Sequence, residues 1–298
     1  MDVINKNIPL NSYTVSIGNI RKIYRGLQRL VDEEADLEIA RWAPLTDQTQ
    51  EEFEARKTQV RKLAFRVTIT VNRENGSSTY GDTEDIFDLS GHDSFVASIF
   101  MTNKTAFRRE ANTDPVNWFE LLFDFSQPAL MDANSIVSSP TRNASGFQIN
   151  GSREGWLAGI ERLVLNQIDK KHKLRRFFHG PFVYDYGLIF FGMPLAIYTC
   201  WILVPFVNGV ISSQSNILGN GTYVYIVLAS LWFYRVLFGY TKWAFPLVEM
   251  KEQQKRPKLH RRFWWGLVIL LSGKIFWDFF DPYISIGRWF AAPYWSTW

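Results

Sequence analysis

Two polar stretches in the N-terminal half hold the residues with the clearest potential for chemistry. His92 stands beside Asp93 in the segment SGHDS, where Ser90 or Ser94 could offer a hydroxyl nucleophile to a histidine base. Adjacent residues cannot form a catalytic triad by themselves, because the base must face its nucleophile and its orienting acid on opposite sides. We therefore expect His92 to be a loop histidine, and an enzyme with a site near His92 is the alternative.

The second stretch, DTEDIFDL, holds the densest group of carboxylates in the chain. These carboxylates are Asp82, Glu84, Asp85 and Asp88. Clustered carboxylates can bind Mg²⁺ or Ca²⁺, but their order lacks the DxDxDG spacing of a calcium loop. We expect a solvated turn with acids at the start of a short helix, and no metal. An enzyme with a site over Asp82–Asp88 is the alternative.

Motifs that would fix an activity are missing from the sequence. The chain has no GxxxxGK[ST] phosphate loop, no GxGxxG, no GxSxG elbow and no HExxH pair. Its single cysteine, Cys200, excludes a disulfide framework and a cysteine-built zinc site. We therefore expect a protein without enzymatic activity and without a cofactor.

The net charge of +4 and the pI near 9.0 average two different halves. Residues 1–168 carry 18 Lys plus Arg against 23 Asp plus Glu, a net charge of −5, whereas residues 169–298 carry 15 against 6, a net charge of +9. Charged residues at 21% and hydrophobic residues at 47% exclude a disordered chain. Because the cations border apolar segments, we expect membrane topology rather than nucleic-acid binding to account for them.

A membrane hairpin is predicted over residues 186–248. No charged residue or histidine lies between Asp185 and Arg235, and this run contains one apolar block at 186–211 and another at about 223–240. A helix needs about 20 residues to cross about 30 Å of hydrocarbon, and the first block has that length alone. Soluble helices almost always keep a polar face, which neither block has.

A third apolar block, FWWGLVILLSGKIFWDFF, opens the segment 263–298. It is short for a span, and it contains Lys274 and Asp278, which share a helical face and could neutralise one another. We favour a full span over residues 263–280, with an interfacial or re-entrant segment as the alternative. The aromatic tail that follows is typical of a membrane interface in either case.

Basic residues flank the hairpin in the segments 169–185 and 249–262, and the loop between the two spans has none. They are Lys170, Lys171, Lys173, Arg175, Arg176, Lys251, Lys255, Arg256, Lys258, Arg261 and Arg262. The positive-inside rule places both flanks, and the N-terminal half with them, in the cytoplasm. We expect these cations to contact anionic lipid, at about 1 kcal/mol each.

Two cations lie within the second predicted span. Arg235 and Lys242 are seven residues apart, so they share a helical face, with Arg235 about 10 Å deeper in the membrane. One interpretation is that both side chains extend to the headgroups. The other is that Arg235 faces a subunit interface or a water-filled cavity. Pro194 and Pro205 interrupt the first span and could kink it.

The N-terminal half, residues 1–168, is predicted to be an α+β cytoplasmic domain with two N-terminal helices, an antiparallel sheet of three to four strands and one packing helix. Hydrophobic spacing and turn signals such as Asn75-Gly76 predict helices at 20–42, 49–63 and 153–173, and strands at 65–71, 95–102, 118–125 and 146–149, with residues 79–81 as a candidate start of the strand that returns from the turn. The last helix is expected to run on into the first span. An all-α transmembrane domain of two to three helices completes the fold class.

Two segments carry a resemblance to known proteins. FRVTITVNRENGSSTYGDTEDIFDL and SGFQINGSREGWLAGIERLVLNQI resemble an α+β domain of uncharacterised bacterial membrane proteins, in which a cytoplasmic domain precedes a transmembrane hairpin. The resemblance covers residues 15–250 and rests on pattern rather than on a fixed motif. It implies the architecture and no activity.

The sequence as a whole favours a non-enzymatic bacterial inner-membrane protein. Its cytoplasmic domain would sense or bind an unknown protein or small ligand, and its membrane part would assemble as a homo-oligomer and respond. A membrane-acting effector of a defence or stress system is the sharpest form of this expectation. The alternatives are the membrane-anchored enzyme and a passive membrane scaffold.

Overall fold

The structure is a computed structural model that describes residues 3–44, 48–88, 94–128, 138–168, 173–211 and 215–284. At residues 173–174, 255–256 and 281–284 it describes the backbone alone. The chain forms two compact units, one over residues 1–254 and a second that begins at Lys255. The first unit holds a sheet domain and a hairpin of apolar helices, and the second holds one long helix.

The described residues of the first unit form an antiparallel sheet of six strands in the order β1-β7-β6-β5-β3-β4. The strands are β1 (Ile4–Pro9), β3 (Thr68–Arg73), β4 (Ser78–Gly81), β5 (Val96–Thr102), β6 (Trp118–Asp124) and β7 (Gly146–Gly151). The sheet is larger than the expected three to four strands, and β1, an exposed edge strand without apolar alternation, was not predicted. The tight turn at Gly76, with a φ of +82°, joins β3 to β4 as predicted.

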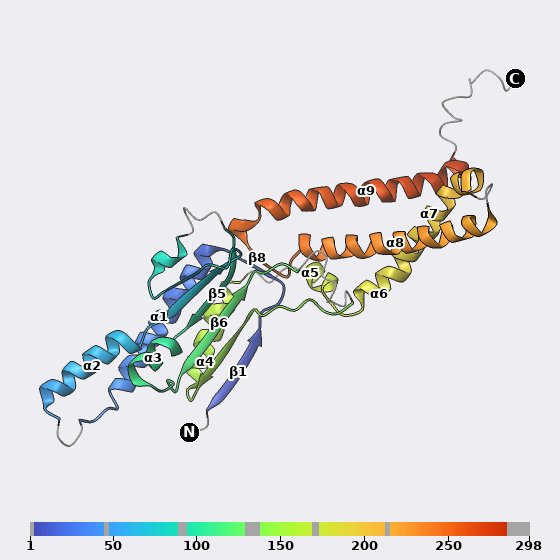
Figure 1. Cartoon of the computed structure of the whole chain (residues 1–298). Helices are drawn as coiled ribbons and strands as arrows, with labels where there is room; N and C mark the ends of the chain where they lie inside the picture. Colours follow the sequence, from blue (N-terminus) through green and yellow to red (C-terminus); the bar gives the residue numbers. More distant parts are fainter. Residues whose placement is uncertain are drawn as a thin grey trace. The chain divides into compact units, whose positions relative to one another are not determined.

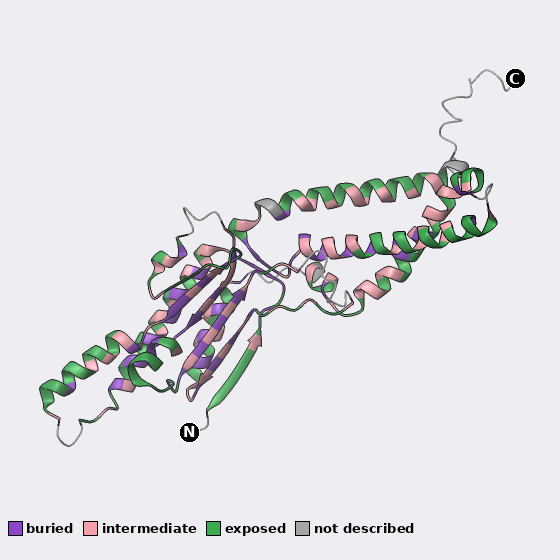
Figure 2. Cartoon of the chain, viewed as in Figure 1, coloured by how far each residue is buried: buried purple, intermediate pink, exposed green. Residues whose placement is uncertain are grey.

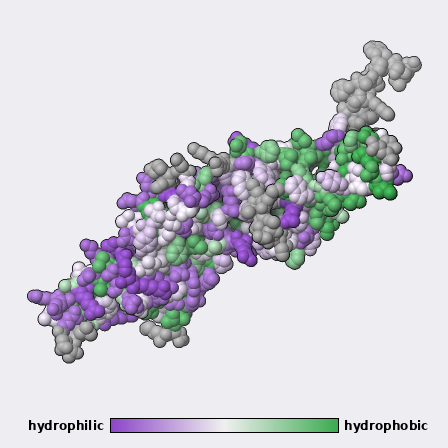
Figure 3. Space-filling view, in the orientation of Figure 1, coloured by the Kyte–Doolittle hydropathy of each residue, from purple (hydrophilic) through white to green (hydrophobic). Residues whose placement is uncertain are grey.

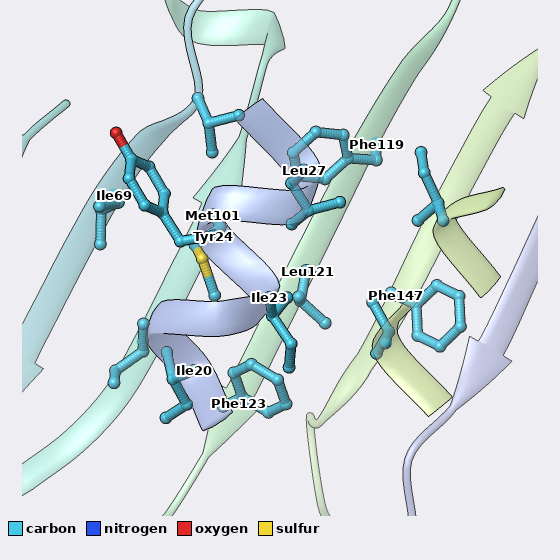
Figure 4. Packing of buried hydrophobic residues seen from close by; sticks show 14 of the residues in the cluster. Ile20, Ile23, Tyr24, Leu27, Ile69, Met101, Phe119, Leu121, Phe123 and Phe147 are labelled. Atoms are coloured by element: carbon cyan, nitrogen blue, oxygen red, sulfur yellow. The ribbon is translucent and has the colours of Figure 1, made fainter. Parts of the chain in front are cut away.

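Two helices cover one face of this sheet (Figure 1). They are α1 (Ile17–Ile39) and α4 (Glu154–Asn166). Apolar residues recur on α1 at helical spacing, so that Ile20, Ile23 and Leu27 are fully buried against the strands (Figure 4). The hydrophobic core therefore lies between these helices and the sheet.

Side chains alternate between the two faces of the sheet. Phe119 and Ile149 are paired on the core face and are buried, as are Ile99 and Phe123. The neighbouring positions on the strands point to the other face and are half-buried. Figure 2 shows the same alternation along β6 and β7.

Three shorter helical segments complete the sheet domain. They are α2 (Gln50–Ala64), the 3₁₀ turn η1 (Glu84–Phe87) and α3 (Lys104–Ala111). Thr49 and Glu52 form a capping box at the start of α2, and acidic residues open this helix as its dipole favours. Residues 84–87 confirm the predicted short helical turn after β4, whereas α3 was not predicted.

The helix α4 ends at Asn166, well before the membrane segment, so the prediction that it runs on to Lys173 and into the first span was wrong. A separate short helix, α5 (Lys173–Phe178), precedes the apolar segment. The backbone amide of Gln167 still bonds to the carbonyl of Val164, which closes the last turn. The sheet domain and the hairpin must therefore be linked by contacts other than one continuous helix.

Three helices in the described residues are long and apolar enough to cross a membrane, so the chain is a membrane protein. The first candidate span, Val183–Ile211, is built from α6 (Val183–Gly187), the π-helical turn η2 (Leu188–Gly192), α7 (Met193–Phe206) and the π-helical turn η3 (Val207–Ile211). The second is α8 (Asn216–Ala244). Hydrophobic side chains gather on the surface of this part of the chain (Figure 3).

The two helices of the hairpin approach closely at glycines of the first span. A side chain at Gly187 would collide with the Tyr234 hydroxyl, and one at Gly192 would lie 3.1 Å from the Tyr234 ring. Tyr234 instead donates a hydrogen bond to the carbonyl of Tyr184 at 3.1 Å. The wider turn η2 lies just before Pro194, which cannot donate a backbone hydrogen bond to the preceding turn. Small residues and this tyrosine therefore set the helix contact.

The second unit contains α9 (Lys255–Ile284), which holds the third candidate span at Pro257–Phe280. This helix is longer than the apolar block that the sequence suggested. Lys274 and Asp278 form the expected ion pair along one face of it.

Candidate functional site

The clearest candidate site is the junction between the sheet domain and the hairpin. Immediately after α8, the chain forms the strand β8 (Val248–Met250), which pairs in parallel with β2 (Tyr13–Val15). Tyr13 also donates a backbone hydrogen bond to the carbonyl of Leu247 at 3.1 Å. All six strand residues are buried, and the apolar ones belong to the hydrophobic core of the sheet domain. The segment that follows the second span is therefore part of the hydrophobic core of the sheet domain.

Residues that follow β2 and β8 both bind the start of α1. Ser16 accepts a hydrogen bond from the Asn19 amide at 3.1 Å, as an N-cap residue does. Glu252 Oε1, which follows β8, accepts one from the Ile17 amide at 3.0 Å. The first turn of α1 contains no acidic residue of its own, so Glu252 supplies the negative charge that a helix N-terminus favours.

A buried ion pair crosses the junction. Arg175 Nη2 lies 2.8 Å from Glu249 Oε2, and their side chains are 11% and 4% exposed. Arg175 also lies 3.5 Å from the Thr14 hydroxyl, and Gln254 donates to Glu249 at 3.2 Å. Removing one partner of a buried ion pair is strongly destabilising, because the charge that remains is buried and uncompensated. This pair therefore ties α5, β2 and β8 together.

His179 joins the loop between β6 and β7 to the end of α8. Its Nε2 lies 2.8 Å from the carbonyl of Phe245, and its Nδ1 lies 2.8 Å from the Thr141 hydroxyl. A carbonyl can only accept, so Nε2 carries the proton, and the neutral ring accepts from Thr141 at Nδ1. The side chain is 3% exposed, and this burial lowers the pKa of His179 to about 4, assisted by the nearby charges of Lys242 and Arg175. His179 is therefore neutral at physiological pH.

Lys242, near the end of α8, also contacts the β6–β7 loop at this junction. Its side chain is 8% exposed, and its ammonium donates to the carbonyl of Ser139 at 3.2 Å and lies over the Phe238 ring. Of the two cations expected within the second span, Lys242 thus lies against the β6–β7 loop of the sheet domain. Arg235 is exposed on α8.

The basic residues of the two flanks have different environments. Arg175 is engaged by Glu249, whereas Arg176, Lys251, Lys258 and Arg262 are exposed. Arg261 is half-buried, and Lys173, Lys255 and Arg256 have no described side chain. Lys170 and Lys171 lie outside the described residues.

The candidate residues for an enzyme have ordinary structural surroundings where they are described. Asp82 forms an ion pair with Arg66, and Glu84 forms one with Arg25, which lowers the pKa of Glu84. The described residues contain no group of three or more side chains placed to bind a metal ion. His92 and Asp93 lie outside the described residues.

Another buried carboxylate, Glu34 of α1, was not among the residues singled out from the sequence. It is 7% exposed and accepts hydrogen bonds from the Asn117 amide and the Arg153 guanidinium, both at 2.5 Å. Asn117 Oδ1 in turn accepts from the Ser152 amide at 3.0 Å. These contacts fix α1 to the ends of β6 and β7 and occupy both carboxylate oxygens, which favours a structural role.

Comparison with known proteins gives no match: no protein-family model, curated protein or solved structure matches this chain. The functional argument therefore rests on the contacts of the junction. Apart from the exposed contact of Glu252, these contacts join the hairpin to the sheet domain through buried or half-buried, directional interactions.

Proposed function

We propose that the chain is a non-enzymatic membrane protein that couples the state of its sheet domain to its membrane helices. The observation that carries this proposal is the parallel pairing of β8, the continuation of α8, with β2, the strand that leads into α1. A shift of α8 along its axis would move β8, and with it the carboxylate of Glu252 that caps α1. The sheet domain would be the part that binds an unknown protein or small ligand.

The cellular setting follows from the charges. Exposed cations on both flanks, together with a loop between the spans that has no Lys or Arg, favour a cytoplasmic sheet domain on a bacterial inner membrane. The exposed flank cations would contact anionic headgroups, and the apolar faces of the helices would contact lipid or further copies of the chain. In its sharpest form, this protein is a membrane-acting effector of a defence or stress system.

Hydrogen exchange on the full chain in lipid nanodiscs tests the coupling. Glu252→Ala removes the charge that caps α1, and the matched control Glu51→Ala removes an exposed carboxylate from the first turn of α2. We expect Glu252→Ala to speed exchange both in residues 17–24 and, across the junction, in residues 236–250. Glu51→Ala should change neither segment.

If the effect of Glu252→Ala stays within α1, the sheet domain is only tethered to the membrane. The passive scaffold would then be the better description, and the coupling proposal would be wrong.

Membrane potential tests the effector form separately. Induced expression of the full chain in bacteria should depolarise the membrane, as measured with a potential-sensitive dye, and Glu252→Ala should reduce that effect while Glu51→Ala does not. An unchanged potential with the wild-type chain would exclude the effector form and leave the coupling proposal to the exchange experiment.

A further inference from the structure

The strand β1 is an exposed edge of the six-stranded sheet. It pairs with β7 over six residues, from Ile4 to Pro9, in one continuous antiparallel register. Five of these six residues are exposed (Figure 2). The opposite edge, β4, is only four residues long. β1 is therefore the longer sheet edge and the one that offers more main chain to a further strand.

The hydrogen-bond pattern shows which main-chain groups of β1 point away from the sheet. The Leu10 amide donates to the carbonyl of Ser145 at 3.0 Å, in the same register as the rest of the strand pair. In an antiparallel pair, residues that exchange hydrogen bonds alternate with residues that do not. The even-numbered residues of β1 therefore bond to β7, whereas the N–H and C=O groups of Asn5 and Asn7 point outward. Within the described residues these outward groups have no hydrogen-bond partner.

β1 lacks most of the features that keep an edge strand from pairing. Such strands are usually short, bulged, interrupted by proline or lined with charged side chains. The register of β1 has no bulge, and its one charged residue, Lys6, forms an ion pair with Glu161 of α4. Pro9 has no N–H to donate, but it stands at the end of the strand. The main chain from Ile4 to Ile8 can therefore accept a partner strand.

The side chains of β1 indicate which kind of strand fits beside it. Asn5 and Asn7 lie on the sheet face opposite α4, beside Gln148, whose amide donates to Asn5 Oδ1 at 3.1 Å. Ile4 and Ile8 lie on the helix-covered face, where Ile4 is 44% exposed and Ile8 packs against the core. A strand with uncharged polar residues on one face and apolar residues on the other matches both sides. A charged residue on that strand would find no unpaired counter-charge on β1.

We propose that β1 binds an extended, uncharged segment of a partner protein, which adds a seventh strand to the sheet. The main chain of this segment bonds to the N–H and C=O groups of Asn5 and Asn7, and its side chains alternate between the amide face and the apolar face. The inference rests on the proposed function in one respect, since it takes the sheet domain as the part that binds a ligand. It names that ligand as a polypeptide strand.

Fluorescence anisotropy with a labelled peptide tests this site on the full chain in detergent. The probe is ASGFQINGS, the sequence of residues 144–152, because this segment contains β7, which pairs with β1 in the structure and has the required alternation. The same peptide with N-methylated backbone amides cannot donate the hydrogen bonds and is the control peptide. A second peptide, ASGFKIKGS, carries charges on its polar face and tests the preference for an uncharged strand.

Proline variants test the edge itself. Asn5→Pro and Asn7→Pro each remove one outward N–H and leave the hydrogen bonds to β7 in place. Tyr80→Pro is the matched control on the opposite edge. The Arg73 amide bonds to the carbonyl of Ser77 in the register of β3 and β4, so the N–H of Tyr80 also points outward.

We expect saturable binding of ASGFQINGS to the wild type, and binding about tenfold weaker to Asn5→Pro and to Asn7→Pro, the loss of one hydrogen bond in each. Tyr80→Pro should bind as the wild type does, and the N-methylated and charged peptides should bind at least about tenfold more weakly. Asn7→Lys leaves the backbone intact but places a charge on the edge, so it should also weaken binding. This variant carries the test if the proline variants do not fold.

The proposal is overturned if the wild type shows no saturable binding, or if both proline variants bind the peptide as tightly as the wild type. It is equally overturned if the chain self-associates in a way that the proline variants abolish, because a second copy would then occupy the edge. Glu252→Ala should leave peptide binding unchanged, so the strand site and the coupling proposed above can fail separately.

Discussion

Arg175 Nη2 and Glu249 Oε2 lie 2.8 Å apart, although the whole hairpin separates them in the sequence. The pair is almost completely buried, so its two charges have lost their water and depend on one another. This relationship joins the segment that enters the membrane to the segment that leaves it.

Removing one partner of this pair should cost more than removing both. Arg175→Met or Glu249→Met alone should lower the free energy of unfolding by about 3–5 kcal/mol, because one buried charge is left uncompensated, whereas the double variant should lie close to the wild type. Denaturant unfolding in detergent, followed by tryptophan fluorescence, measures both. Arg61→Met, which breaks an exposed ion pair with Asp36, is the control and should cost less than about 1 kcal/mol. Equal losses in the single and double variants would contradict the pairing.

His179 predicts a loss of stability in acid. Burial lowers its pKa from 6.5 to about 4, so between these values the unfolded chain binds the proton that the folded chain excludes. Above pH 6.5 His179 does not lower the free energy of unfolding. As the pH falls from 6.5 to 4, protonation of the unfolded chain should lower that free energy by about 3 kcal/mol. His179→Gln, which can still donate to Phe245 and accept from Thr141, should show a correspondingly shallower decline. Parallel pH curves for the two proteins would show that His179 is protonated as easily in the folded state.

The contact between Gly187 and Tyr234 predicts a difference between two glycines. Gly187→Ala would force the Tyr234 hydroxyl away and break its hydrogen bond to Tyr184, at about 1–3 kcal/mol. Gly221→Ala on α8 meets open space and should be neutral or slightly stabilising, because alanine favours helix. Thermal unfolding in nanodiscs compares them. An equal shift in both variants would mean that the helices do not approach at Gly187.

Glu34 should matter for stability far more than its neighbour. Glu34→Gln keeps the shape of the side chain but removes the charge that faces Arg153 and Asn117, and we expect a loss of about 1–3 kcal/mol. Glu33→Gln, at an exposed position, should change stability by less than about 0.5 kcal/mol. Denaturant unfolding measures both, and a catalytic role for Glu34 would instead leave stability unchanged or increased.

Local patterns in the sequence predict most of the elements of the fold. Three local patterns each predicted an element correctly: the alternation in FRVTITV, the Asn75-Gly76 turn and the helical spacing on α1. In each case residues close together in the sequence determine which face of the element is buried. β1 and β8 were missed for the opposite reason. INKNIP has no apolar face, and the three residues Val248–Met250 are too few to show an alternating pattern. Both strands are recognised only through their pairing with β7 and β2.

The junction was beyond sequence reasoning because its contacts join distant positions. The basic flank predicted lipid contact for Arg175, and nothing nearby in the sequence indicates that Glu249 takes up its charge. The sequence suggested that the Lys242 side chain extends to the headgroups, whereas it binds the β6–β7 loop. His179 was not singled out, because no nearby residue indicates its partners Thr141 and Phe245. The early end of α4 at Asn166 was equally hidden, since apolar residues continue to Ile168.

The parallel pairing of β2 with β8 also sets an order of events during synthesis. Tyr13 leaves the ribosome early, but its partner Val248 is made only after both helices of the hairpin. Domains usually fold from the N-terminus as the chain emerges. Here the contact of Glu252 with α1 and the core positions of Val248 and Met250 become available only after both helices of the hairpin have been synthesised, so the sheet domain cannot be completed before then. A chain truncated before Val248 would therefore lack the partner of β2 and part of the hydrophobic core of its N-terminal domain.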